Sequence, residues 1–342
     1  MKEIKTIKDV AALAGVSVAT VGRVIGNYGH VSQKTRNKVI QAVQELNYYP
    51  NAIAQGMRNH STKTIAVIVG SIKNNFFSEI VYAIERVARK QGYNVLICNT
   101  HEKEKLEIQH LEMLRSKQID GIIIASSFAR KQDIAVKYRY LYENEIPMVC
   151  IDRNIMDLDR DVIESEHFEG AYEATEYLLQ LGHEKICVIG MGQPPTSTVR
   201  IRISGYEKAL EDHQVSFDKN RVLCIDYEET VAQEEISDFF DRNGDMTAIL
   251  VLNNSLCSGV LKEMVKRGLK CPDNLSLIGW DDEALNQILN ITTVEQQISK
   301  IGSLAAERLF YLIENRESKG EHMVTTLKTH LLIRSSCKKI DR

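Results

Sequence analysis

The residues near the N-terminus whose side chains could act together are Ser17, Val18, Ala19 and Arg23. Ser17 is a residue type that caps helix N-termini, so the residues after it would lie in the first turns of a helix. From that helix the Arg23 guanidinium can give two hydrogen bonds to a guanine edge, and Val18 and Ala19 can contact a thymine methyl group. Arg23 could instead contact a phosphate, which strengthens binding without selecting a sequence. This chemistry is non-covalent recognition of DNA.

Two short helices joined at Gly15 would position these residues. Gly15 suits the left-handed conformation that ends a helix, and Val16 can plug the space between the two helices. The apolar positions recur at helical spacing and are Val10, Ala11, Ala14, Val21 and Val24. This pattern predicts a helix-turn-helix unit whose second helix enters the DNA major groove. The alternative is a helical hairpin with no DNA role.

The charge distribution supports the DNA interpretation. Residues 1–63 contain nine Lys or Arg and three Asp or Glu, a formal charge of +6. The whole chain has a formal charge of −3, so residues 64–342 carry −9. A basic head on an acidic body fits a head that meets phosphates.

Composition bounds the class of protein. The chain has 342 residues, with 44% hydrophobic and 26% charged residues, which is typical of globular proteins with a sizeable core. It has no run of 18 apolar residues and no apolar secretion signal, so we expect no membrane segment and a cytoplasmic location. Seven scattered cysteines form no Cys-x-x-Cys pair, so neither a metal site nor a disulfide framework is expected.

The rest of the chain predicts a domain order. Residues 1–50 form the DNA-binding domain, with a third helix from about Lys34 to Leu46 capped by Ser32. Residues 51–63 are expected to form a short hinge helix and linker. From Thr64 to Arg342, short β-branched runs alternate with amphipathic helical stretches, which predicts parallel sheets. These elements divide near residues 152–163 into two α/β lobes, and the cleft between such lobes is the expected place for a small ligand.

Two other classes of protein fit less well. An enzyme on a nucleotide-binding sheet is disfavoured because Pro194 and Pro195 follow Gly190-Met-Gly192, where a pyrophosphate needs a helix start. The sequence also has no serine elbow and no phosphate loop with lysine, so we expect neither catalytic residues nor a cofactor. A transport binding protein would also have two lobes. The basic helix-turn-helix and the lack of a signal peptide argue against this class. A regulator whose core answers to a partner protein stays open.

These residues resemble the LacI/GalR family of bacterial transcription regulators over nearly the whole chain. The motifs that carry the resemblance are Thr6-Ile-Lys-Asp-Val-Ala-x-Leu-Ala-Gly-Val-Ser-Val-Ala-Thr-Val, Val31-Ser-x-Lys-Thr-Arg, Leu46-Asn-Tyr-x-Pro-Asn, Asp120-Gly-Ile-Ile, Ile151-Asp-Arg, Gly170-Ala-x-x-Ala-Thr, Leu181-Gly-His, Gly205-Tyr-x-x-Ala-Leu, Gly279-Trp-Asp-Asp and Thr292-Thr-Val-x-Gln. The resemblance implies a helix-turn-helix head, a hinge helix and a core of two Rossmann-like lobes like those of periplasmic sugar-binding proteins. It also implies a homodimer on a palindromic operator.

The resemblance implies roles in the head. It favours base contacts for Arg23, Val18 and Ala19. Backbone-positioning contacts with DNA are expected from Thr6, Ser17, Thr20, Thr35 and Arg36. In the hinge helix, Asn51 and Ala54 are expected at the minor groove, and Met57 could wedge open a base step. A passive linker with a buried Met57 is the alternative.

The resemblance also implies a ligand site in the core. The expected contacts are Phe76, Phe77, Asp152, Arg202, Asn253, Trp280 and Asp281. One of the two phenylalanines could be core, a core role for Trp280 is as plausible as stacking on a sugar, and Asp152 with Arg153 could be an ion pair between the lobes. Glu166-His167, Asn254 and Gln297 depart from the usual Asp-Asn, Asp and Pro, which suggests an unusual effector. A sugar, sugar acid or sugar phosphate is expected, and the sign of its effect on DNA binding is open.

Overall fold

The computed structural model describes residues 5–26, 28–48, 61–127, 138, 146–153, 155, 160–193, 195–226, 229–315 and 322–340. The chain forms two compact units, Met1–Lys63 and Thr64–Arg342. Among the described helices, none is long and apolar enough to cross a membrane. No group of three or more His, Cys, Asp or Glu side chains in this part of the chain could hold a metal ion.

The described part of the head is a bundle of three helices. These are α1 (Ile7–Ala14), α2 (Val18–Ile25) and α3 (Gln33–Glu45). Gly15 ends α1 in the left-handed conformation, with φ of 65°, as its sequence position predicts. The helices pack on a small apolar core that includes Val10, Val21 and Val39, each fully buried.

The N-terminal lobe is a six-stranded sheet covered on both faces. Its strands are β1 (Thr64–Val69), β2 (Asn94–Asn99), β3 (Gly121–Ile124), β4 (Met148–Ile151), β5 (Asp161–Ser165) and β11 (Val324–Leu327). They pair in the order β11-β5-β4-β3-β1-β2, and every pair is parallel. Helices α5 (Asn75–Lys90) and α13 (Ile298–Glu314) pack on one face, and α6 (Glu104–Lys117) packs on the other.

The C-terminal lobe repeats this plan. Its strands are β6 (Ile186–Met191), β7 (Val222–Ile225), β8 (Ala248–Val251), β9 (Ser276–Trp280), β10 (Thr292–Glu295) and β12 (His330–Leu332). Their order is β12-β10-β9-β8-β6-β7, with only β12 antiparallel to its neighbour. One face packs on α8 (His167–Gln180) and α9 (Ser197–Asp212), and the other on α10 (Glu229–Arg242) and α11 (Asn254–Lys266). Two short elements, η2 (Lys219–Arg221) and α12 (Ala284–Ile288), complete it.

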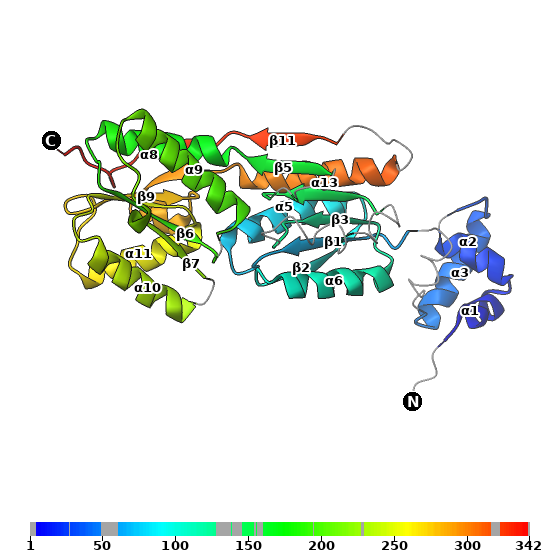
Figure 1. Ribbon diagram of the computed structural model, residues 1–342. Helices are drawn as coiled ribbons and strands as arrows, with labels where there is room; N and C mark the ends of the chain where they lie inside the picture. Colours follow the sequence, from blue (N-terminus) through cyan, green and yellow to red (C-terminus); the bar gives the residue numbers. More distant parts are fainter. Residues whose placement is uncertain are drawn as a thin grey trace. The chain divides into compact units, whose positions relative to one another are not determined.

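The chain passes between the lobes three times (Figure 1). It leaves the N-terminal lobe after β5, returns from β10 to α13, and leaves again between β11 and β12. Strand β11, which lies between the second and third crossings, therefore completes the N-terminal sheet with residues from near the C-terminus. The predicted fold class, an all-α helix-turn-helix domain followed by two Rossmann-like lobes, is confirmed.

Candidate DNA-binding and ligand-binding sites

The start of α2 presents the residues assigned to base contacts. The Ser17 hydroxyl oxygen accepts a hydrogen bond from the Thr20 backbone N–H at 3.1 Å, which caps the helix. Val18, Ala19 and Arg23 are exposed on this helix. No hydrogen bond or ion pair engages the Arg23 side chain among the described residues, so its guanidinium is available to a base or a phosphate.

The residues assigned to the DNA backbone surround helix N-termini. The Thr20 and Thr35 hydroxyls lie 2.9 Å from the Ser17 and Ser32 hydroxyls that cap α2 and α3. Thr6 donates to Asp9 from its backbone N–H and its hydroxyl, and these hydrogen bonds lower the pKa of Asp9. Helix N-termini attract phosphate because their first N–H groups lack partners within the helix.

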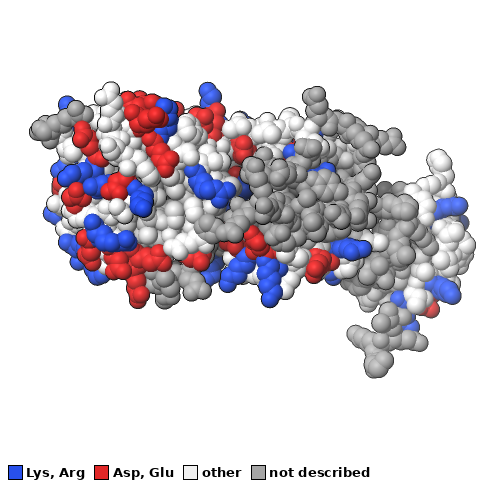
Figure 2. All heavy atoms as spheres, in the orientation of Figure 1, with Lys and Arg blue, Asp and Glu red and all other residues white. Residues whose placement is uncertain are grey.

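Charge is segregated between the units. Figure 2 shows Lys and Arg side chains with few acids on the described part of the head, and mixed charge over the lobes. Arg36 is half-buried near the start of α3. The hinge residues Asn51, Ala54 and Met57 lie outside the described residues.

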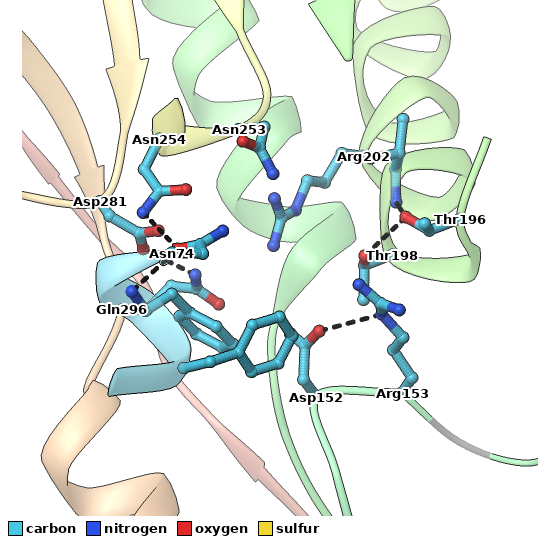
Figure 3. Close-up of a pocket in the computed structure, with 13 residues that line it drawn as sticks. Asn74, Asp152, Arg153, Thr196, Thr198, Arg202, Asn253, Asn254, Asp281 and Gln296 are labelled. Carbon is cyan, nitrogen blue, oxygen red and sulfur yellow. Dashed lines mark hydrogen bonds and ion pairs between the residues drawn. The ribbon is translucent and has the colours of Figure 1, made fainter. Parts of the chain in front are cut away.

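A pocket of about 380 Å³, part of it open to solvent, lies where strands of both lobes end (Figure 3). Asp152 directly follows β4 of the N-terminal lobe, and Asp281 directly follows β9 of the C-terminal lobe. Other lining residues follow β1, β6, β8 and β10. Ligands of parallel α/β sheets bind at the carboxyl ends of strands, so the topology itself brings these side chains together.

The pocket contains most of the ligand contacts expected from the sequence. Those that line it are Phe76, Phe77, Asp152, Arg202, Asn253 and Asp281. Lining residues absent from the expected set are Asn74, Arg153, Thr196, Thr198, Val199, Asn254 and Gln296. Gln296 could have been identified from the sequence, because it ends the Thr292-Thr-Val-x-Gln motif. For Asn74, Thr196 and Thr198 the sequence indicates only that they follow buried strands.

Trp280 is the correction to the expected set. Its side chain is fully buried in the core of the C-terminal lobe and does not line the pocket. The Arg202 guanidinium lies over the indole ring, 4.0 Å from the ring centroid. Trp280 therefore supports Arg202 by a cation–π contact, and the core role replaces stacking on a ligand.

Asp152, His167 and Arg202 form a chain of contacts between the lobes. The His167 Nδ1 atom accepts from Arg202 Nη2 at 3.1 Å, and its Nε2 lies 3.4 Å from an Asp152 carboxylate oxygen. Burial and the nearby charge of Arg202 lower the pKa of His167, so the ring is neutral at neutral pH. Burial alone would raise the pKa of Asp152, but the hydrogen bond from His167 and the charges of Arg153 and Arg202 hold it below its usual value.

Asp281 has the opposite electrostatic character. Burial raises the pKa of Asp281 to about 7, although a hydrogen bond from Gln296 Nε2 at 2.7 Å lowers it in part. Asp152 and Asp281 both have left-handed φ values, 61° and 65°. This conformation is uncommon for a residue other than glycine and is concentrated at functional sites.

Asn254 links the lobes on the other side of the pocket. Its Nδ2 donates to Asn74 Oδ1 of the N-terminal lobe at 2.8 Å and to Glu283 Oε1 at 2.7 Å. Both amides have a fixed orientation, because Asn74 Oδ1 also accepts from the Phe76 backbone N–H and Asn254 Oδ1 from that of Ser255. The asparagine that departs from the usual aspartate thus supplies the two hydrogens that this link requires.

Asn254→Asp is expected to loosen the contact that Asn254 makes between the lobes. The new carboxylate would face two acceptor oxygens and lose both hydrogen bonds, a cost of about 1–3 kcal/mol. Small-angle X-ray scattering of the isolated protein should give a larger radius of gyration for this variant. The matched control is Asn253→Asp, because Asn253 uses only its oxygen, which caps α11 through the Ser255 N–H at 3.0 Å. Equal radii of gyration for the two variants would contradict the role of Asn254 in joining the lobes.

Comparison with family models covers both units. Residues 6–51 match a model described as bacterial regulatory proteins of the lacI family. Residues 62–335 match a model described as periplasmic binding proteins and sugar binding domain of the LacI family. The two matches follow each other in the order that the sequence motifs indicated.

Curated relatives match along their full length. The HTH-type transcriptional repressor PurR of Histophilus somni (strain 129Pt) is 31% identical over 335 residues, which cover 97% of this chain and 99% of the relative. The HTH-type transcriptional regulator DegA of Bacillus subtilis (strain 168) is 34% identical over 337 residues, or 97% of each chain.

Solved structures agree with this assignment. The lac repressor dimer bound to operator and the anti-inducer ONPF superposes with a TM-score of 0.84 at 26% identity, covering 98% of this chain and 100% of that chain. A LacI-family regulator from Enterococcus faecium with bound ribose gives a TM-score of 0.71 at 26% identity, covering 81% of this chain and 100% of that chain. The chain therefore belongs to the LacI family of bacterial transcription regulators, with a DNA-binding head and an effector-binding core.

Proposed function

We propose that this protein is a repressor whose homodimer binds a palindromic operator in the cytoplasm, and that a small hydroxylated ligand in the pocket controls this binding. The observation that carries the proposal is the pocket, because its polar side chains come from both lobes. A ligand that contacts both lobes stabilises one arrangement of the lobes over another, and only such differential binding can shift the protein between two states. The ribose-bound relative supports a sugar as the class of ligand.

The head supplies the DNA contacts in this proposal. Arg23, Val18 and Ala19 read bases, and Thr6, Ser17, Thr20, Thr35 and Arg36 position the DNA backbone. Asn51, Ala54 and Met57 act in the hinge at the minor groove. For the homodimer, Leu285, Ile288 and Leu289 around α12 provide exposed apolar side chains that a second copy could bury.

A mobility-shift titration tests this proposal. The probe is the DNA upstream of the protein's own gene, at two salt concentrations, with a panel of sugars, sugar acids and sugar phosphates. Specific binding that one compound abolishes or strengthens is the expected result. Specific binding that no compound alters would indicate that a partner protein controls operator binding. Loss of specific binding at low salt would overturn the role of the head.

Arg23→Ala is expected to weaken binding to each operator half-site by about 1–3 kcal/mol, because it removes a bidentate contact to guanine. Its effect on binding to unrelated DNA should be small. Lys38→Ala is the matched control, since it removes one exposed positive charge from α3 of the same head. That control should lower affinity for all sequences alike and reduce the salt dependence by about one unit. If Arg23→Ala behaves in the same way, Arg23 contacts a phosphate.

A further inference from the structure

Arg153, which lines the pocket, is held by a glutamate behind it. Glu102 binds the Arg153 guanidinium with both carboxylate oxygens, at 2.5 Å from Nη1 and 2.9 Å from Nη2. The Arg153 side chain is only 8% exposed and the Glu102 side chain only 5%. Arg153 Nη1 also donates to the Ser126 backbone carbonyl at 3.2 Å, and its Nε lies 3.4 Å from an Asp152 oxygen. The guanidinium is thus surrounded by acceptors of its own lobe.

The backbone is shaped to place Glu102 there. His101 and Glu102 follow β2 with left-handed φ values of 51° and 57°. Their turn brings the Glu102 carboxylate against Gly70, at the end of β1, where an added Cβ atom would lie 1.7 Å from Glu102 Oε1. Residues after three strands therefore build this ion pair. Gly70 after β1 leaves space for Glu102 after β2, which binds Arg153 after β4.

The charged side chains around the pocket therefore offer a ligand more hydrogen-bond acceptors than donors. Among the described residues, the carboxyl groups at or directly behind it include those of Glu102, Asp152, Asp281 and Glu283. Among the described lining residues the cations are Arg153 and Arg202. Arg202 directs hydrogen bonds to His167 and, at 2.6 Å, to the Leu252 carbonyl.

Gln296 also offers an unsatisfied acceptor to the pocket. Gln296 Oε1 is buried and has no hydrogen-bond partner among the described residues. A ligand that donates hydrogen bonds would satisfy this oxygen and the Asp152 and Asp281 carboxyl groups, whereas a phosphate or carboxylate would bring further acceptors to them.

We propose that Glu102 is a specificity-determining residue: by holding Arg153, it makes the pocket select neutral ligands that donate hydroxyl hydrogen bonds over phosphorylated or carboxylated ones. This inference rests on the proposed function of the pocket. Of the three ligand classes expected from the sequence, it selects the neutral sugar.

Glu102→Gln tests this directly, because the change keeps the side-chain shape and removes one negative charge. The probe is inorganic phosphate against chloride at matched ionic strength, and the readout is the fluorescence of Trp280, the one tryptophan of the chain. The wild type is expected to show no specific response to phosphate. The variant should bind phosphate at least about tenfold more tightly, since the carboxylate that neutralised Arg153 is gone.

Two further variants assign the effect. Glu112→Gln removes the same charge from an exposed position on α6 and should behave as the wild type. Glu102→Gln combined with Arg153→Gln should lose the response to phosphate. If the single variant does not fold, phosphate binding to the wild type still decides the question, because specific binding there contradicts the proposal.

The outcomes separate this inference from the proposed function. A folded Glu102→Gln protein that ignores phosphate overturns the role of Glu102, even where a neutral sugar controls operator binding. A sugar phosphate or sugar acid that controls the wild-type protein also overturns it and leaves the proposed function intact. A panel in which no compound affects operator binding overturns the proposed function itself.

Discussion

Replacing Arg202 with methionine is expected to shift the response of operator binding to the proposed pocket ligand to about 10- to 100-fold higher ligand concentrations, by about 1.5–3 kcal/mol, while operator binding itself remains. Arg202 is 5% exposed and contacts Trp280, His167 and the Leu252 carbonyl. Methionine has a similar length and keeps the apolar contact with the indole, but it has no hydrogen-bond donor. Losing the charged donor that we propose Arg202 offers to the ligand costs about 1.5–3 kcal/mol, so ligand affinity should fall by about 10- to 100-fold.

Arg202→Met should also lower the free energy of unfolding by about 2–4 kcal/mol, because the Leu252 carbonyl and His167 Nδ1 lose their partner in a buried site. Urea unfolding followed by Trp280 fluorescence measures this change. Arg200→Met is the matched control, since Arg200 is exposed on the same helix and donates to the Pro195 carbonyl. A variant at 202 that keeps the ligand response would place ligand recognition elsewhere.

The head could be predicted from sequence because its determinants are local. Ser17 and Ser32 each cap a helix that begins at the next residue, and Gly15 has the left-handed conformation assigned to it. Each of these signals acts over three or four residues. A single sequence contains all the information that they need.

The two lobes could be predicted only in part. Alternation of strands and helices indicated parallel sheets, but no sequence motif indicates that α13 returns to the N-terminal lobe or that β11 pairs with β5. Such pairings join segments far apart in sequence, and no local pattern specifies them. The pocket had the same difficulty, because Asn74, Thr196 and Gln296 come together only when six strand ends converge.

The departures from family motifs have structural explanations. Gln297, where proline is usual, donates from its side chain to the Lys328 carbonyl at 3.0 Å and so joins two of the segments that connect the lobes. His167 connects Arg202 to Asp152, and Asn254 connects Asn74 to Glu283. All three changes fall at contacts between the lobes or at their crossings. We infer that they adjust how the lobes close.

Asp281→Asn is expected to stabilise the protein at neutral and alkaline pH. The folded-state pKa of Asp281 is about 7, above the ordinary value of 3.8, because the carboxyl is buried. Between these two values the folded state binds more protons than the unfolded state, so the free energy of unfolding falls as the pH rises from about 4 to about 7 and then levels off. Asparagine carries no charge and removes this decline. The stabilisation should be near zero at pH 4 and reach at most about 4 kcal/mol above pH 8.

The neighbouring carboxyl provides a control of opposite sign. Burial would raise the pKa of Asp282, but hydrogen bonds from Arg334 and Thr293 hold it below its usual value. Its ionised form therefore stabilises the fold above the unfolded pKa, and this contribution is lost as the pH falls through the lower folded value. Asp282→Asn should then destabilise the protein at pH 7 and much less in acid. Urea unfolding of both variants from about pH 3 to about pH 8.5 compares them. A pH-independent effect of Asp281→Asn would contradict the raised pKa on which the prediction depends.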